Sequence, residues 1–379
     1  MLTKESRQKY SDILVILLFL WFYLSSFLWQ PFYEKVSGFG TLILFLGSGA
    51  LFLINTDIRD LFTGEDKRHV IADLAVMAAA DVLALLNLFI LGSNKGAALV
   101  IWSMTLVLFL AGRITVSENT KRILSGCGCI LLIPWYAVVR WDYGFNMAGL
   151  AFLVFFLMGV VFLEYIKNDL EFEYLKLVQA VFFAATMLLL ICYHARSMIV
   201  SLLVFGMVWL LLHHIRDKKL YFRALCVIFT LGSIAFTGLY SALGATGFQL
   251  RILYKDVLSG REGIWSELWG ALIKQPLTGV GSSYELKSFF IFEVHNGLFD
   301  ILAVHGIPVF ILFMWLLYRA LFRLERWDYR WYPDRRLAVS GVFALLTASF
   351  FENCFIVPPY SMIFFALLLL SECGGTASR

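Results

Sequence analysis

Long apolar runs recur along nearly the whole chain, separated by short polar segments. We distinguish about twelve, most of them long enough as helices to cross roughly 30 Å of hydrocarbon. The predicted spans are 12–30, 39–57, 70–92, 97–112, 123–139, 146–164, 175–192, 197–213, 220–240, 296–318, 338–356 and the shorter 358–371. The pattern predicts an all-α, polytopic membrane protein.

One connection is much longer than the others. It divides the chain into residues 1–240 with nine spans, a long loop at 241–294, and residues 295–379 with three more spans. Loops of that length usually carry function.

Within the long loop, the stretch "GREGIWSELWGALIK" has the periodicity of an amphipathic helix. Ser259 is the expected N-cap, and Pro276 ends the run. The helix is too short to span a membrane, and Trp265 and Trp269 lie on its apolar stripe. We therefore expect it to lie along the membrane surface, where indole rings concentrate.

Composition and charge define the class of protein more closely. Apolar residues make up 60% of the chain and charged residues only 15%, against about 25% charged in soluble domains. If the N-terminus is cytoplasmic, 22 of the 31 Lys and Arg residues fall on the cytoplasmic side. Since positive charges are retained there, we expect both termini to be cytoplasmic and the long loop to be external.

Charge, motifs and cysteines also indicate which cofactors and partners to expect. The charges of the long loop balance, which argues against nucleic acid as a partner, and the chain has no Walker motif. Most of the six cysteines lie in or beside apolar spans and suggest neither a disulfide framework nor a metal site. Energy for a reaction must then come from an activated substrate or an ion gradient.

Three external positions are candidates for chemistry. Arg196 opens the eighth span, Arg261 opens the loop helix, and His295 opens the tenth span. Two guanidinium forks can clamp a diphosphate. Arg196 can instead be a snorkelling residue and Arg261 an interfacial anchor, although arginine is unfavourable at a helix N-terminus.

His295 is the candidate general base. The positive end of a helix dipole favours neutral imidazole, which can accept a proton. A capping or water-facing histidine remains the alternative. Asn296 is a candidate substrate contact, with a plain cap as its alternative.

Other polar and special residues are candidate substrate contacts. Glu352 lies near the outer end of the eleventh span, and Arg140 is external but can also be an interfacial anchor. Gly279 and Gly281 permit either a tight turn or a close approach of the backbone to a ligand. Trp265, in the loop helix, is an aromatic candidate for a substrate contact.

Three residues lie deeper in apolar runs. Asp81 is near mid-membrane, where either a helix–helix hydrogen bond or an ion path would account for it. We interpret His305 as buried and hydrogen-bonded, and we expect Pro308 to kink the tenth span.

Three stretches together resemble the superfamily of O-antigen ligases and Wzy-type O-antigen and capsule polymerases. "HNGLFDILAVHG" is similar to its His-Asn motif, with Gly306 as the closing glycine. "GREGIW…ALIKQPLTGVG" is similar to its loop segment, and "ARSMIVSLLV" to its span opening, with Ala195 in place of a small hydroxyl residue. The resemblance is specific over about residues 190–310.

The resemblance implies a GT-C-like fold and an inverting, metal-independent glycosyl transfer on the outer face of the bacterial cytoplasmic membrane. The donor would be a saccharide on undecaprenyl diphosphate, and the acceptor another lipid-linked saccharide. Arg196 and Arg261 would bind the diphosphate, and His295 would deprotonate the acceptor hydroxyl. No cofactor is implied; membrane lipids and a chain-length regulator are the other implied partners.

Alternatives remain within and outside this chemistry. We favour a polymerase, because the ligase form commonly has glycine where this chain has Val309 and because the loop is modest. A ligase that transfers the glycan to lipid A-core or another surface acceptor is the nearest rival. A lipid or solute transporter, which Asp81 would permit, is the rival from another class.

Overall fold

The fold is helical. The computed structural model describes residues 3–371 except 24–29, 57–66, 93–94, 115, 131–144, 171–173, 215–217, 249, 253–254, 257, 288–292, 327–328, 330 and 355. The α-helices are α1 (Lys4–Tyr23), α2 (Gln30–Asn55), α4 (Lys67–Leu91), α5 (Lys95–Leu110), α6 (Glu118–Ile130), α8 (Phe145–Leu170), α9 (Leu175–Cys192), α10 (Arg196–His214), α11 (Lys218–Ala245), α12 (Arg261–Lys274), α13 (Gly297–Phe322), α14 (Pro333–Ala348) and α15 (Pro358–Ser371). A 3₁₀ turn, η2 (Arg323–Arg326), follows α13.

Each of the twelve predicted runs overlaps one of these helices. Six helices among the described residues are long and apolar enough to cross a membrane, and three shorter ones are apolar too. A polytopic, helical membrane protein is thus confirmed, while twelve spans stay a prediction. The eleventh run differs most, because α14 ends at Ala348 and residues 349–354 and 356–357 are in turns and bends.

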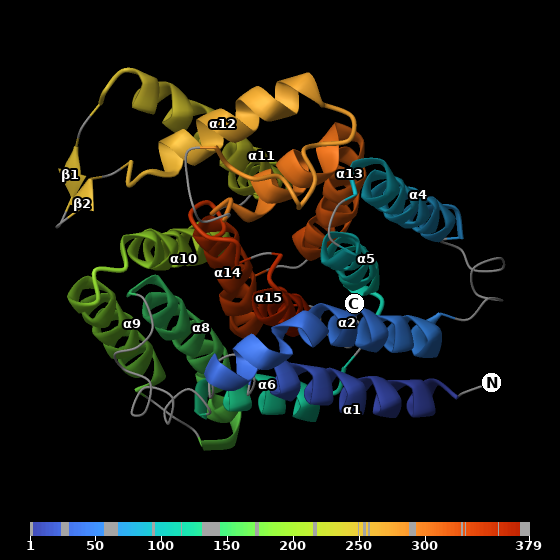
Figure 1. Ribbon diagram of the computed structural model, residues 1–379. Helices are drawn as coiled ribbons and strands as arrows, with labels where there is room; N and C mark the ends of the chain where they lie inside the picture. Colours follow the sequence, from blue (N-terminus) through green and yellow to red (C-terminus); the bar gives the residue numbers. More distant parts are fainter. Residues whose placement is uncertain are drawn as a thin grey trace.

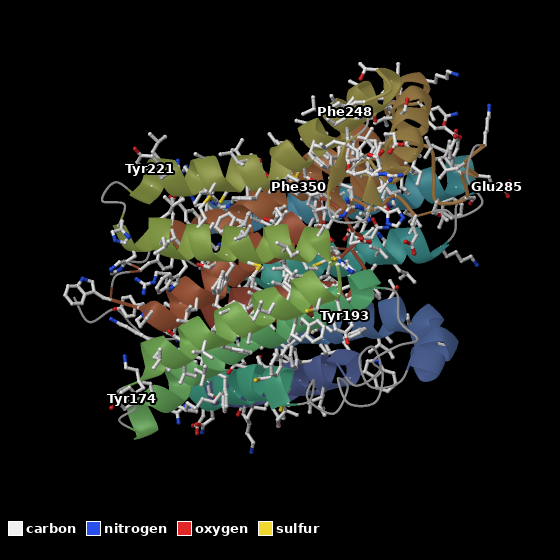
Figure 2. The ribbon with its side chains drawn as sticks, turned by 90° about the vertical axis from the view of Figure 1, so that its left-hand side faces the viewer. Tyr174, Tyr193, Tyr221, Phe248, Glu285 and Phe350 are labelled. Carbon is white, nitrogen blue, oxygen red and sulfur yellow. The ribbon has the colours of Figure 1, made fainter. Side chains whose placement is uncertain are left out.

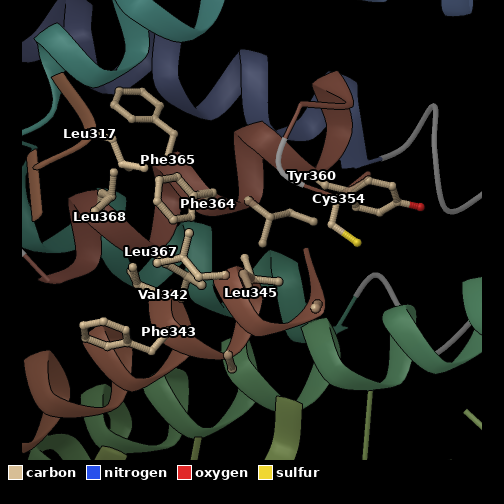
Figure 3. Packing of buried hydrophobic residues seen from close by; sticks show 14 of the residues in the cluster. Leu317, Val342, Phe343, Leu345, Cys354, Tyr360, Phe364, Phe365, Leu367 and Leu368 are labelled. Carbon is tan, nitrogen blue, oxygen red and sulfur yellow. The ribbon is translucent and has the colours of Figure 1, made fainter. Parts of the chain in front are cut away.

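The hairpin of α14 and α15 forms the centre of the packing. Every residue from Arg335 to Ala348 is buried, and so is every residue from Tyr360 to Ser371. On one side α14 packs against α8 and α10, and α15 packs against α1, α2 and α5. Figure 3 shows the resulting contact between the two helices, with Phe343 on one and Phe364 on the other. A helix that is apolar all round is typical of such a position.

The connections cluster at two opposite ends of the helix bundle. Tyr174 and Tyr221, at the predicted cytoplasmic ends of the seventh and ninth spans, lie at one end, and Phe248 and Glu285, from the long loop, lie at the other (Figure 2). The predicted alternation of the connections is therefore consistent with the arrangement of the helices.

The long loop is folded against the helices that flank it. Its helix α12 packs along α11, which extends to Ala245, as Figure 1 shows at the edge of the molecule. Before α12, two-residue strands β1 (Arg251–Ile252) and β2 (Lys255–Asp256) pair antiparallel. The expected N-cap of α12 is wrong by one residue. Gly260 occupies it, in a left-handed conformation and without a side-chain cap.

Helix α13 is broken at Gly306, where φ is 81° and ψ is 172°. Pro308 follows two residues later and has no N–H to donate, so the predicted kink is confirmed. Carbonyl groups freed by the break find other donors: Val280 N donates to Ala303 O over 2.8 Å, and Gly281 N to Val304 O over 3.0 Å. The Asn87 side chain, on α4, donates to His305 O over 2.8 Å.

Candidate functional site

Three helices begin close to one another at the end that carries the long loop. The first residue of α10 is Arg196 and that of α12 is Arg261, while α13 begins directly after His295 and Asn296. A helix N-terminus carries partial positive charge and unsatisfied N–H groups. This end of the molecule therefore combines helix dipoles with two guanidinium groups.

The chain turns sharply before each of these helices. His194, Ser259 and His295, each with φ of 53°, are the non-glycine residues with positive φ in the described part of the chain. Each lies two positions before the first residue of its helix. Such conformations cost about 1 to 3 kcal/mol each and concentrate at functional sites.

Glu352 links two of the candidate residues. Its Oε1 lies 2.6 Å from Nη2 of Arg261, and its Oε2 lies 3.3 Å from Nδ1 of His295. The side chains of Arg261 and Glu352 are 16% and 17% exposed, and that of His295 is 25% exposed. The structure thus brings together three candidates from α12, the start of α13 and the turn after α14.

This contact has a consequence for the imidazole. When Nδ1 carries the proton and donates it to Glu352, Nε2 is left with its lone pair as a proton acceptor. A second carboxylate, that of Glu293, lies 3.6 Å from Nδ1 but is 60% exposed. Glu352 is therefore the better-placed partner.

Arg196 lies in the same region but holds a different group. Its Nη1 donates to the carbonyl of Asp256 in β2 over 3.1 Å. Tyr240, near the end of α11, lies within electrostatic range of both Arg196 and Arg261. Ala195 is fully buried against Gly149 of α8, where an added Cβ would collide with it. Close packing of α8 and α10 thus accounts for the small residue before Arg196.

Asn296 supports the site through hydrogen bonds to several surrounding segments. It is fully buried, and its Oδ1 accepts from Phe299 N over 2.9 Å as the N-cap of α13. Its Nδ2 donates to Ser233 Oγ over 2.9 Å and to Phe350 O over 3.2 Å. Its own N–H donates to Oδ1 of Asn353 over 3.0 Å. The capping interpretation of Asn296 is the one that the structure supports.

Gly279 and Gly281 lie against the break in α13. Both have positive φ, and a Cβ on Gly279 would lie 2.5 Å from Gly306 N and from Val304 O. Of the two interpretations left open, the structure shows the turn, in which Gly279 N donates to Gln275 O over 3.0 Å. The close approach is to the backbone of α13, and an approach to a ligand stays a prediction.

Trp265 is enclosed by protein. It is fully buried, contacts the rings of Phe236 and Tyr240, and donates from Nε1 to Val294 O over 2.6 Å. The expectation that its indole lies at the membrane surface is therefore wrong, because the apolar stripe of α12 packs onto α11. Ile273 and Leu277, at the other end of this segment, are the apolar side chains that remain exposed.

The remaining candidates lie elsewhere. Asp81 accepts from Thr105 Oγ1 over 2.9 Å, so it makes a hydrogen bond between α4 and α5. His305 is buried as expected, and its backbone carbonyl is the group that accepts from Asn87. Arg140 falls outside the described residues.

Two residues near the site were not singled out from the sequence. Asp300, one turn into α13, is contacted by Asn353 Nδ2 at 3.4 Å. The rule that selected Asp81, an ionisable group within an apolar run, would have found it. Tyr240 lies in an ordinary helical run, so only its proximity to the two arginines indicates a role.

The arrangement suits an anion and a proton transfer. Helix N-termini and guanidinium groups bind phosphate oxygens, and an imidazole oriented by a carboxylate can accept a proton. Within the described stretches, no group of three or more His, Cys, Asp or Glu side chains is placed to hold a metal ion.

Comparison with known proteins agrees with the motifs. Residues 179–314, which include α10 to α12, the long loop and most of α13, match the family model described as O-antigen ligase. No curated protein and no solved structure matches the chain. The match covers less than half of the chain, but it contains Arg196, Arg261 and His295. Residues 179–314 therefore carry an O-antigen ligase family domain, as the resemblance of the motifs predicted.

Proposed function

We propose that this protein is a membrane glycosyltransferase that polymerises oligosaccharide repeat units carried on undecaprenyl diphosphate. The observation that supports it best is the convergence of Arg261, Glu352 and His295 where three helices begin. A diphosphate and a hydroxyl to be deprotonated are the two groups that such a site suits. The product would be O-antigen, capsule or exopolysaccharide.

The reaction needs no group beyond substrate and protein. The acceptor hydroxyl oxygen attacks the anomeric carbon of the donor, and the bond from that carbon to the diphosphate oxygen breaks with inversion. Nε2 of His295 takes the hydroxyl proton, while Arg196 and Arg261 stabilise the charge that develops on the leaving diphosphate. Undecaprenyl diphosphate leaves as the second product.

In this proposal the site faces outward from the cytoplasmic membrane. Residues 1–240 and 295–379 form the transmembrane body, residues 241–294 form the external loop, and both termini are cytoplasmic. The exposed apolar end of the α12 segment, at Ile273 and Leu277, would then contact lipid.

His295→Ala and Arg261→Ala test the assignment in cells that make the polymer. Each is expected to reduce chain elongation at least about a hundredfold, since each removes a proton acceptor or a transition-state charge contact. The readout is the ladder of polymer lengths on a gel, with protein level in the membrane measured alongside. Lys274→Ala, which removes a cation at the far end of α12, is the matched control and should leave the ladder intact.

Persistence of long polymer in both variants would refute the proposed roles. Loss of the ladder in Lys274→Ala as well would show that the assay reports folding of the loop and not chemistry.

Ligation is the second candidate, because the matching family model is described as O-antigen ligase. The two reactions share the site and differ in the acceptor. Purified protein with a defined lipid-linked repeat unit separates them. Elongation without a second acceptor supports the polymerase, whereas transfer only to added lipid A-core or another surface acceptor supports the ligase.

A further inference from the structure

Glu352 holds two groups of the site at once. Its two carboxylate oxygens contact Arg261 at 2.6 Å and His295 at 3.3 Å, and all three side chains are largely buried. The Arg261 contact is a short, charge-assisted hydrogen bond. A phosphate oxygen that takes the same guanidinium N–H must replace this carboxylate oxygen.

We infer that Glu352 is the resident anion of the site, which the donor diphosphate displaces from Arg261. The inference rests on the proposed function and adds a positioning residue to it. On displacement, the phosphate supplies the negative charge that Arg261 loses, and Glu352 keeps its contact with Nδ1 of His295. Glu352 then orients the imidazole without touching the donor, in contrast to the substrate contact expected from the sequence.

Two opposite effects follow from this arrangement. The ion pair lowers the affinity for diphosphate, because only the fraction of protein with Arg261 released is competent to bind. The same carboxylate raises turnover, because it fixes which imidazole nitrogen accepts the proton. Removing its charge should therefore change binding and catalysis in opposite directions, which a purely structural role of Glu352 would not do.

Glu352→Gln in the purified full-length protein tests the inference. Undecaprenyl diphosphate in detergent micelles is titrated onto wild type and variant, and the dissociation constant is measured. We expect the variant to bind undecaprenyl diphosphate about tenfold more tightly, because the charge-assisted contact by which Glu352 competes for Arg261 is lost. We also expect kcat for transfer to fall about tenfold or more. Binding that is unchanged or weaker overturns the inference.

Two further variants provide a second test at Glu352 and a control at another carboxylate. Glu352→Asp retains the charge but has a shorter side chain that reaches less far toward Arg261, so we expect a smaller gain in affinity for undecaprenyl diphosphate. If Glu352→Gln does not fold, the affinity of Glu352→Asp tests the inference in its place. Glu267→Gln removes a carboxylate of α12 that accepts hydrogen bonds from Tyr284 OH and Lys287 N. Its affinity for undecaprenyl diphosphate should equal that of wild type.

Arg261→Gln separates this inference from the proposed function. If wild type and Arg261→Gln bind undecaprenyl diphosphate equally, Arg261 is not a diphosphate ligand, and the proposed function and the inference both fail. If Arg261→Gln loses binding and Glu352→Gln gains none, the proposed function stands and the inference alone is overturned.

Discussion

At the scale of single residues, the neighbours His295 and Asn296 have different surroundings. His295 is partly exposed beside Glu352, whereas Asn296 is fully buried among Ser233, Phe350 and Asn353. The side-chain and main-chain hydrogen bonds of Asn296 join α11, α13 and the turn that carries Glu352. Asn296 therefore fixes where His295 stands relative to its carboxylate partner.

We expect Asn296→Ala to destabilise the protein by about 2 kcal/mol or more, from loss of the cap and of partners for buried groups. The measurement is thermal unfolding of detergent-purified protein. Asn296→Ser, which keeps a capping oxygen, should lose less. Equal unfolding temperatures for wild type and Asn296→Ala would contradict the structural role described for this residue.

Residue chemistry explains which parts of the site the sequence could predict. Arg261, His295 and Glu352 are ionisable groups at the ends of apolar runs, and that pattern alone selects them. The partner of Arg196 is the carbonyl of Asp256, which any residue could supply, and Ser233 is one hydroxyl among many. Contacts of that kind depend on the packing of distant helices.

At the scale of elements, the loop after α12 and the break in α13 depend on each other. The break leaves carbonyl groups of α13 without intrahelical donors, and the N–H groups of Val280 and Gly281 satisfy two of them. Ile307 N in turn donates to Pro276 O over 2.9 Å. Glycine is needed at 279 and 306 because the two backbones approach closely there.

Gly279→Ala should therefore be severely destabilising, by about 3 kcal/mol or more, because a Cβ would meet three backbone atoms of α13 and φ is 71°. Gly270→Ala is the matched control in α12, where a Cβ meets nothing within 4 Å. It should be neutral or more stable by about 1 kcal/mol. Unfolding temperatures and membrane levels of the two variants are compared, and similar values would contradict the packing described.

Helices were predictable from their apolar runs, but their neighbours were not. The periodicity of α12 is the same whether its apolar stripe faces lipid or another helix, so sequence alone placed Trp265 wrongly at the membrane surface. The end of α14 was also missed, because "SFFENCFIVPP" continues the apolar run through a turn. Hydropathy does not detect a turn whose backbone bonds are satisfied within the protein.

At the scale of the whole molecule, the two ends of the bundle should lie on opposite sides of the membrane. Lys287→Cys, in the long loop, should react in intact spheroplasts with a membrane-impermeant maleimide, whereas Lys219→Cys at the start of α11 should react only after lysis. Both positions are exposed. The opposite pattern would reverse the predicted orientation.

The native cysteines set the background for that measurement. Cys192 is exposed and should be replaced first. Cys354 is buried, and burial together with the nearby charge of Glu352 raises the pKa of its thiol well above its usual range. It should therefore label slowly in every sample, since the thiolate is the reactive form.

The contacts of Val280 and Gly281 with α13 also divide the long connection into two separate loops, each fixed at both ends. One runs from the end of α11 to the start of α12, and the other from Gly281 to His295. Each doubling of the length of a flexible loop costs only about 0.6 kcal/mol in free energy of loop closure. Either loop can therefore accept inserted residues without moving the helix starts around His295. Relatives that recognise larger acceptors are expected to carry their additional residues in these two intervals, and to keep the length between Arg261 and Gly281 constant.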